Sequence, residues 1–106
     1  MNKRTVKYNG NTYTVEFCLE SLCYMEDIGF KQDDFDNIPF SALVKLVQGA
    51  LYMHHPEITR QEASEIYAKG VAKKDKKAFV QDLIKFYMAC ANDVMGEEGN
   101  EEGTAD

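Results

Sequence analysis

The sequence has no tryptophan, only two prolines and three cysteines, and no long apolar run. A helix that spans a membrane needs roughly 20 consecutive apolar residues, so we expect a soluble protein that does not bind a membrane. The charged N-terminus is not followed by the apolar stretch of a secretory signal. Because the cysteine count is odd and no such signal precedes it, we expect reduced thiols in a cytoplasm and no disulfide framework.

Positive charge is also scarce. Twelve lysines and arginines stand against eighteen aspartates and glutamates, which gives a net charge of −6 and argues against a nucleic-acid-binding protein. Residues 96–106 carry five of the acidic residues, no basic residue and no large apolar one. A segment of this composition cannot bury enough apolar surface to offset its ordering entropy. We therefore expect one domain over residues 1–95 and a disordered acidic tail over residues 96–106.

The sequence also lacks the motifs of common catalytic and ligand-binding sites. There is no glycine-rich phosphate loop and no nucleophile elbow. His54 and His55 are adjacent and Cys18 and Cys23 are five residues apart, so neither pair has the spacing of zinc ligands. The aspartates within residues 31–37 do not follow the spacing of a calcium loop. We expect a protein that is not an enzyme and that binds no cofactor and no metal.

The first part of the chain predicts a β-hairpin over residues 4–17. Its two halves alternate in hydropathy around Asn9-Gly10, which is a favoured two-residue hairpin turn. The alternation places Val6 and Tyr8 on one face of the first strand, and Tyr13, Val15 and Phe17 on one face of the second. A lone hairpin is marginal in water, so it must pack on helices or join another sheet.

Helical periodicity and end signals account for most of the remaining chain. Thr59 and Glu62 form the pattern of a capping box at the start of the third helix, and Asp75 is the expected N-cap of the fourth. We expect an α+β fold that is mostly α, in which the hairpin packs on a bundle of about four helices. The predicted helices cover residues 18–28, 40–53, 59–70 and 76–95.

Two of these helices have more apolar surface than a small core requires. The second has apolar residues on two sides, and those of the fourth cover an arc of roughly 200°, against about 100° for an ordinary surface helix. Either the hairpin covers the surplus flank of the fourth helix, or this flank is exposed for a partner or a second copy. The candidate partner-binding residues are Leu46, Met53, Val80, Ile84 and Met88.

The order of elements, together with two short motifs, resembles the tail assembly chaperones of tailed bacteriophages and prophages, especially those of Gram-positive hosts. Residues 19–29 read Leu-x-x-Leu-x-x-Met-Glu-Asp-x-Gly, and residues 56–63 read Pro-Glu-Ile-Thr-x-x-Glu-Ala before a short helix. Met25-Glu26 stands where Leu-Glu is usual in that family, and Ile58-Thr59 stands where Leu-Thr is usual. The resemblance covers roughly residues 8–94.

This resemblance implies a non-catalytic protein of the bacterial host cytoplasm. Such chaperones bind the tape-measure protein, keep it soluble during assembly, help to recruit tail-tube subunits and are absent from the finished virion. The implied partners are therefore the tape-measure protein and the tail-tube protein, and the surplus apolar surface also suggests self-association. The alternative is a small structural virion protein, such as a connector or a tail-completion subunit.

Overall fold

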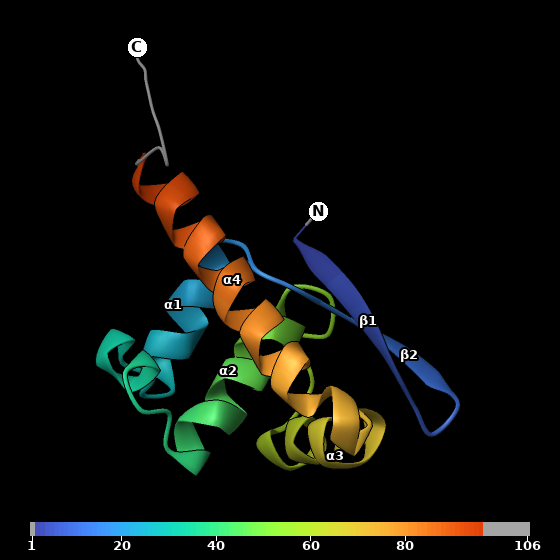
Figure 1. Ribbon diagram of the computed structural model, residues 1–106. Coiled ribbons are helices and arrows are strands. Elements are labelled where there is room, and N and C mark those ends of the chain that lie inside the picture. The colour runs from blue at the N-terminus through green and yellow to red at the C-terminus, as the bar shows by residue number, and fades with distance from the viewer. Residues whose placement is uncertain (1, 97–106) are drawn as a thin grey trace.

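A two-stranded hairpin followed by four α-helices makes up the described part of the chain, residues 2–96 of the computed structural model (Figure 1). This confirms the predicted α+β, mostly helical fold. Except for Gly96, the segment predicted as an acidic tail lies outside the described residues. The elements are β1 (Lys3–Tyr8), β2 (Asn11–Glu16), α1 (Leu19–Asp27), the 3₁₀ turn η1 (Gln32–Phe35), α2 (Phe40–Tyr52), α3 (Arg60–Gly70), the 3₁₀ turn η2 (Lys73–Asp75) and α4 (Lys76–Met95).

The hairpin forms as its turn sequence predicts. Asn9 and Gly10 both have positive φ, at 54° and 81°, as a two-residue turn matched to the strand twist requires. Val6 lies opposite Tyr13 in the antiparallel register, and Val6 and Val15 are buried. One face of the hairpin thus packs on the helices, with β1 against α3 and β2 against α2.

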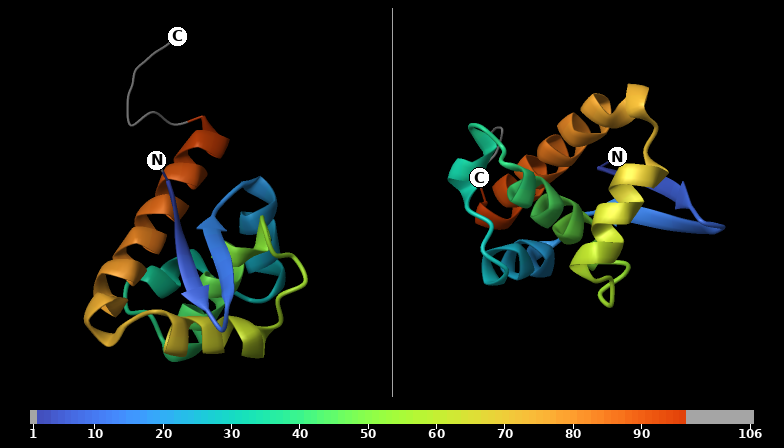
Figure 2. Two further views of the ribbon diagram at one scale, coloured as in Figure 1. Left: turned by 90° about the vertical axis from the view of Figure 1, so that its right-hand side faces the viewer. Right: turned by 90° about the horizontal axis from the view of Figure 1, so that it is seen from below.

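Helix α2 is the centre of the molecule. It contacts α1, α3, α4 and β2, so both of its apolar sides are covered (Figures 1 and 2). Gly49 allows the close approach of α1, because a Cβ at this position would lie only 2.3 Å from the Met25 Cγ and Sδ atoms. The buried residues of α2 are Ala42, Leu46, Val47, Gln48, Gly49, Ala50 and Leu51.

The ends of α1 and α3 are set by local hydrogen bonds. At the end of α1 the Gly29 amide donates to the Glu26 carbonyl (3.0 Å) and the Phe30 amide donates to the Met25 carbonyl (2.8 Å), which is the Schellman pattern. At the start of α3 the Glu62 amide donates to Thr59 Oγ1 (3.1 Å) and the Thr59 amide donates to Glu62 Oε1 (2.9 Å). The predicted capping box is therefore confirmed.

Helix α4 has the predicted bounds but begins differently from the prediction. Asp75 makes no side-chain cap; its carboxylate accepts a hydrogen bond from the Arg4 guanidinium at 2.8 Å. Arg4 also donates to Asp82 at 2.8 Å and lies over the Phe79 ring. Asp75 thus occupies the expected N-cap position, but its carboxylate binds Arg4 and does not cap the helix. Within residues 2–96 no helix combines the length and apolarity needed to cross a membrane.

Candidate functional site

Leu46 is not available to a partner, which corrects the prediction that it belongs to a partner-binding flank. The side chain is fully buried. Hydropathy periodicity identifies the two apolar sides of α2 but does not reveal that α1, α3, α4 and β2 surround this helix. Leu46 is therefore a core residue.

The other four predicted residues divide into two groups. Met53, just after α2, and Met88, on α4, are exposed, at 42% and 41%. Val80 and Ile84 are only partly exposed, and Ile84 packs against the core cluster. None of the five predicted residues lines the two cavities between α1 and α4 that are described below.

The hairpin does not cover the Val80 and Ile84 flank, although this was one of the two outcomes expected from the sequence. It reaches α4 through the ion pair between Arg4 and Asp82. Residues two apart on a helix are turned by about 200°, so Asp82 and Ile84 face opposite sides of α4. The hairpin therefore packs on the side of α4 away from Ile84.

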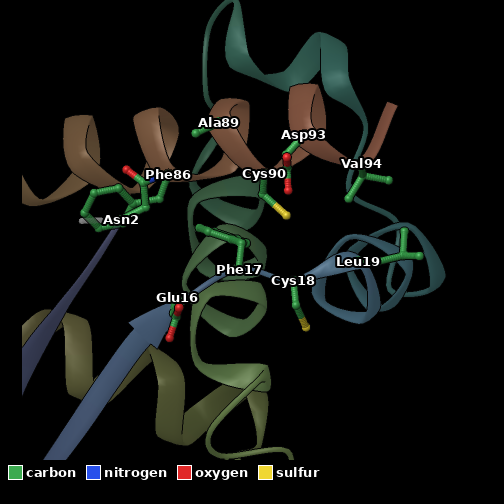
Figure 3. A pocket seen from close by; sticks show the side chains of 10 residues that line it. All are labelled: Asn2, Glu16, Phe17, Cys18, Leu19, Phe86, Ala89, Cys90, Asp93 and Val94. Atoms are coloured by element: carbon green, nitrogen blue, oxygen red, sulfur yellow. The ribbon is translucent and has the colours of Figure 1, made fainter. Parts of the chain in front are cut away.

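Two hollows of the described surface lie between α1 and α4 instead. A cavity of about 600 Å³ has α4 on one side and the end of β2 with the start of α1 on the other (Figure 3). Its lining residues are Asn2, Glu16, Phe17, Cys18, Leu19, Phe86, Ala89, Cys90, Asp93 and Val94.

A second cavity, of about 400 Å³, adjoins the first, because Leu19 and Val94 line both. We call the two cavities together the α1–α4 groove. The remaining residues of the second cavity are Leu22, Cys23, Glu26, Gln32, Tyr87, Ala91, Asn92 and Met95.

Three apolar side chains at this groove are exposed and are not among the partner-binding residues predicted from the sequence. Leu19 is 52% exposed, Met95 is 72% exposed, and Val94 is exposed as well. Large apolar side chains gathered beside a concave surface are typical of a contact site for another molecule. The sequence shows apolar residues at the start of α1 and at the end of α4. It does not show that these two segments lie side by side, because only the fold brings them together.

The charged residues that line the groove are all acidic. Glu16 and Asp93 line the first cavity and Glu26 lines the second, and no lysine or arginine is among the described residues around either. Glu16 also lies 2.8 Å from His54 Nε2. The groove is thus lined by both apolar and polar side chains, and all of its charged side chains are acidic.

The two histidines after α2 hold the strand that leads into the groove. His54 contacts the Glu16 carboxylate, and the backbone amide of Thr14 donates to His55 Nε2 at 3.0 Å. Both contacts are to β2, whose end continues directly into Phe17 at the groove wall. The histidines therefore position one side of the groove, a role that their adjacency in the sequence does not indicate.

Three thiols lie at the groove. Cys18, Cys23 and Cys90 are all free. Burial raises the pKa of the Cys90 thiol, and nearby Cys18 and Asp93 raise it further, so Cys90 is protonated and weakly nucleophilic at neutral pH. Within residues 2–96 no group of three or more histidine, cysteine, aspartate or glutamate side chains is arranged to hold a metal ion.

The chain folds into a small, mostly helical α+β domain with a groove between α1 and α4, beside which apolar side chains are exposed. The chain belongs to the DUF5055 family, described as a domain of unknown function, whose sequence profile matches residues 1–105. Comparison with curated proteins and with solved structures gives no significant match. The family membership covers nearly the whole chain and leaves the function to be argued from the groove.

Proposed function

We propose that this protein is a phage tail assembly chaperone that binds the tape-measure protein and helps to recruit tail-tube subunits, without catalysis, in the cytoplasm of the bacterial host. The first support is the resemblance of its motifs and element order to that family. The motif over residues 19–29 corresponds to α1 and its C-terminal cap, and the motif over residues 56–63 contains the capping box that opens α3.

The observation that carries the proposal is the exposed apolar surface at the α1–α4 groove. A tape-measure protein is a long helical chain with an apolar stripe, which must be shielded from water until the tail tube surrounds it. A concave surface with Leu19, Val94 and Met95 exposed beside it suits the apolar face of a helix. Methionine adapts to irregular partners, so Met95 suits a partner whose sequence varies along its length.

Co-expression tests the proposal. The tape-measure protein encoded beside this gene should be produced in the same cells with and without the tagged protein. We expect the tape-measure protein to stay in solution and to co-purify only when the tagged protein is present. A tape-measure protein that is equally insoluble in both cases, with none bound to the tag, contradicts the proposed function.

A structural virion subunit is the second candidate, and Phe40 favours it. This side chain is 88% exposed at the start of α2 and lines neither cavity of the groove, so the molecule has a further apolar contact point. Mass spectrometry of purified virions separates the two functions. A chaperone is absent from the finished particle, whereas a connector or tail-completion subunit is present in fixed copy number.

A further inference from the structure

We infer that the α1–α4 groove binds an amphipathic helix whose apolar stripe is bordered by lysine or arginine. The inference rests on the proposed function and states which kind of tape-measure segment the chaperone recognises. It follows from the shape of the groove and from the sign of its charges.

The shape suits two apolar anchors of one helix. The two cavities, of about 600 and about 400 Å³, lie next to each other and share the exposed side chains of Leu19 and Val94. A bound helix presents anchors at i, i+3 or i+4, and i+7, which are neighbours along one face. Adjoining hollows, each with apolar side chains in its lining, can take successive anchors of such a face.

The charges select a basic helix. Glu16, Glu26 and Asp93 line the groove, with no lysine or arginine among its described residues. The basic segment Lys73–Lys77 is at the other end of α4, about 25 Å from Asp93 at 1.5 Å per residue. This separation is well beyond the Debye length of about 8 Å at physiological salt, so those lysines do not neutralise Asp93. Glu16 is the acidic residue with a lysine nearby, because it lies opposite Lys3 in the hairpin.

The acidic residues of the chain's own C-terminal end do not match this surface. Residues 97–106 contain five acidic residues and neither a basic nor a large apolar residue, so they offer no anchor and would be repelled by Glu26 and Asp93. A partner helix with lysine or arginine beside its apolar stripe has both features that the groove requires.

Two synthetic 18-residue peptides test the inference with the full-length protein. Both have the same leucine face; one has lysine and the other has glutamate at the remaining positions. Fluorescence anisotropy at low salt should show that the lysine peptide binds at least tenfold more tightly than the glutamate peptide. Added salt should weaken binding of the lysine peptide, because the attraction is between charges.

Variants with matched controls locate the site. Leu19→Gln with Val94→Gln removes apolar contacts without changing the charge, and should weaken binding of the lysine peptide at least tenfold. Phe40→Gln is the control, since this side chain is exposed away from the groove, and it should bind like the wild type. Glu26→Gln with Asp93→Asn should reduce both the affinity and its salt dependence, whereas Glu57→Gln should not.

Amide NMR shifts of the labelled full-length protein show where the peptide binds and whether each variant is folded. Shifts confined to α1 and the second half of α4 support the inference. Equal affinity for both peptides, no binding of either, shifts concentrated in residues 97–106, or occupation of the groove by a second copy of the protein would each overturn it.

The same variants separate this inference from the proposed function. If the tape-measure protein co-purifies equally with the wild type and with the Leu19→Gln, Val94→Gln variant, the chaperone function stands and the groove assignment is wrong. If the groove binds the lysine peptide as expected but no tape-measure protein co-purifies, the groove assignment stands and the chaperone function is wrong.

Discussion

At the scale of single residues, Arg4 shows what hydropathy patterns leave out. It lies opposite Val15 in the hairpin, on the inward face, and its guanidinium contacts carboxylates 71 and 78 residues away, those of Asp75 and Asp82. Burial alone would lower the pKa of Arg4, but hydrogen bonds to Asp82 and Asp75 outweigh burial and raise it. No local signal in the sequence joins these three residues, because the contact depends on where the hairpin packs on α4.

Replacing Arg4 with methionine should weaken the packing of the hairpin on α4. Both ion pairs are partly exposed, so we expect the free energy of unfolding to fall by only about 1 kcal/mol at low salt. Arg4→Lys should lower the free energy of unfolding by less, because lysine keeps the positive charge. Urea titrations at low and high salt measure the difference in stability between the variant and the wild type. This difference should be smaller at high salt, because salt screens the two ion pairs of the wild type. An Arg4→Met variant that is as stable as the wild type at low salt contradicts the prediction.

The Cys90 thiol should make stability fall at alkaline pH. Its pKa is raised by burial, so the unfolded chain loses this proton at a lower pH than the folded protein does. The contribution is fully present below the ordinary cysteine pKa of about 8.5 and is lost as the pH rises through the folded value. Denaturant titrations between pH 8 and 10 should give a steeper loss for the wild type than for Cys90→Ala; identical slopes contradict the prediction.

At the scale of elements, local sequence signals predict where a helix or strand begins and ends. Tertiary packing decides which of its faces are buried against other elements. The Asn9-Gly10 turn, the Thr59–Glu62 box and the bounds of α4 follow from short-range preferences that act in any context. The groove could not be predicted in this way, because its walls come from α1 and α4, which are far apart in the chain. Likewise, His54 and His55 carry no pattern that would indicate their contacts with β2.

Leu46, in the middle of α2, and Met53, just after its end, test how far along this helix the core extends. Leu46→Ala should lower the free energy of unfolding by about 2–5 kcal/mol, because it leaves a cavity in a fully buried site. Met53→Ala should change it by no more than about 0.5 kcal/mol, since this side chain is exposed after the end of the helix. Chemical denaturation of the two variants provides the comparison, and equal losses would mean that Met53 is also part of the core.

At the scale of the whole molecule, the exposed apolar side chains of α4 should cause self-association at high concentration. Met88 is the side chain to change, because Ile84 packs against the core and a charge there would disturb the fold. Sedimentation velocity should show the wild-type weight-average mass rising with concentration and Met88→Glu staying monomeric. A wild type that is monomeric throughout, or a variant that associates equally, rules out this surface.

We propose that the α1–α4 groove holds the tape-measure protein. Co-purification of co-expressed tape-measure protein with three tagged forms of the chain tests this proposal: wild type, Leu19→Gln with Val94→Gln, and Phe40→Gln. We expect the wild type and Phe40→Gln to retain the tape-measure protein alike, and the groove variant, shown to be folded by amide NMR, to retain less than a tenth as much. Equal retention by all three forms would mean that the tape-measure protein binds elsewhere or not at all.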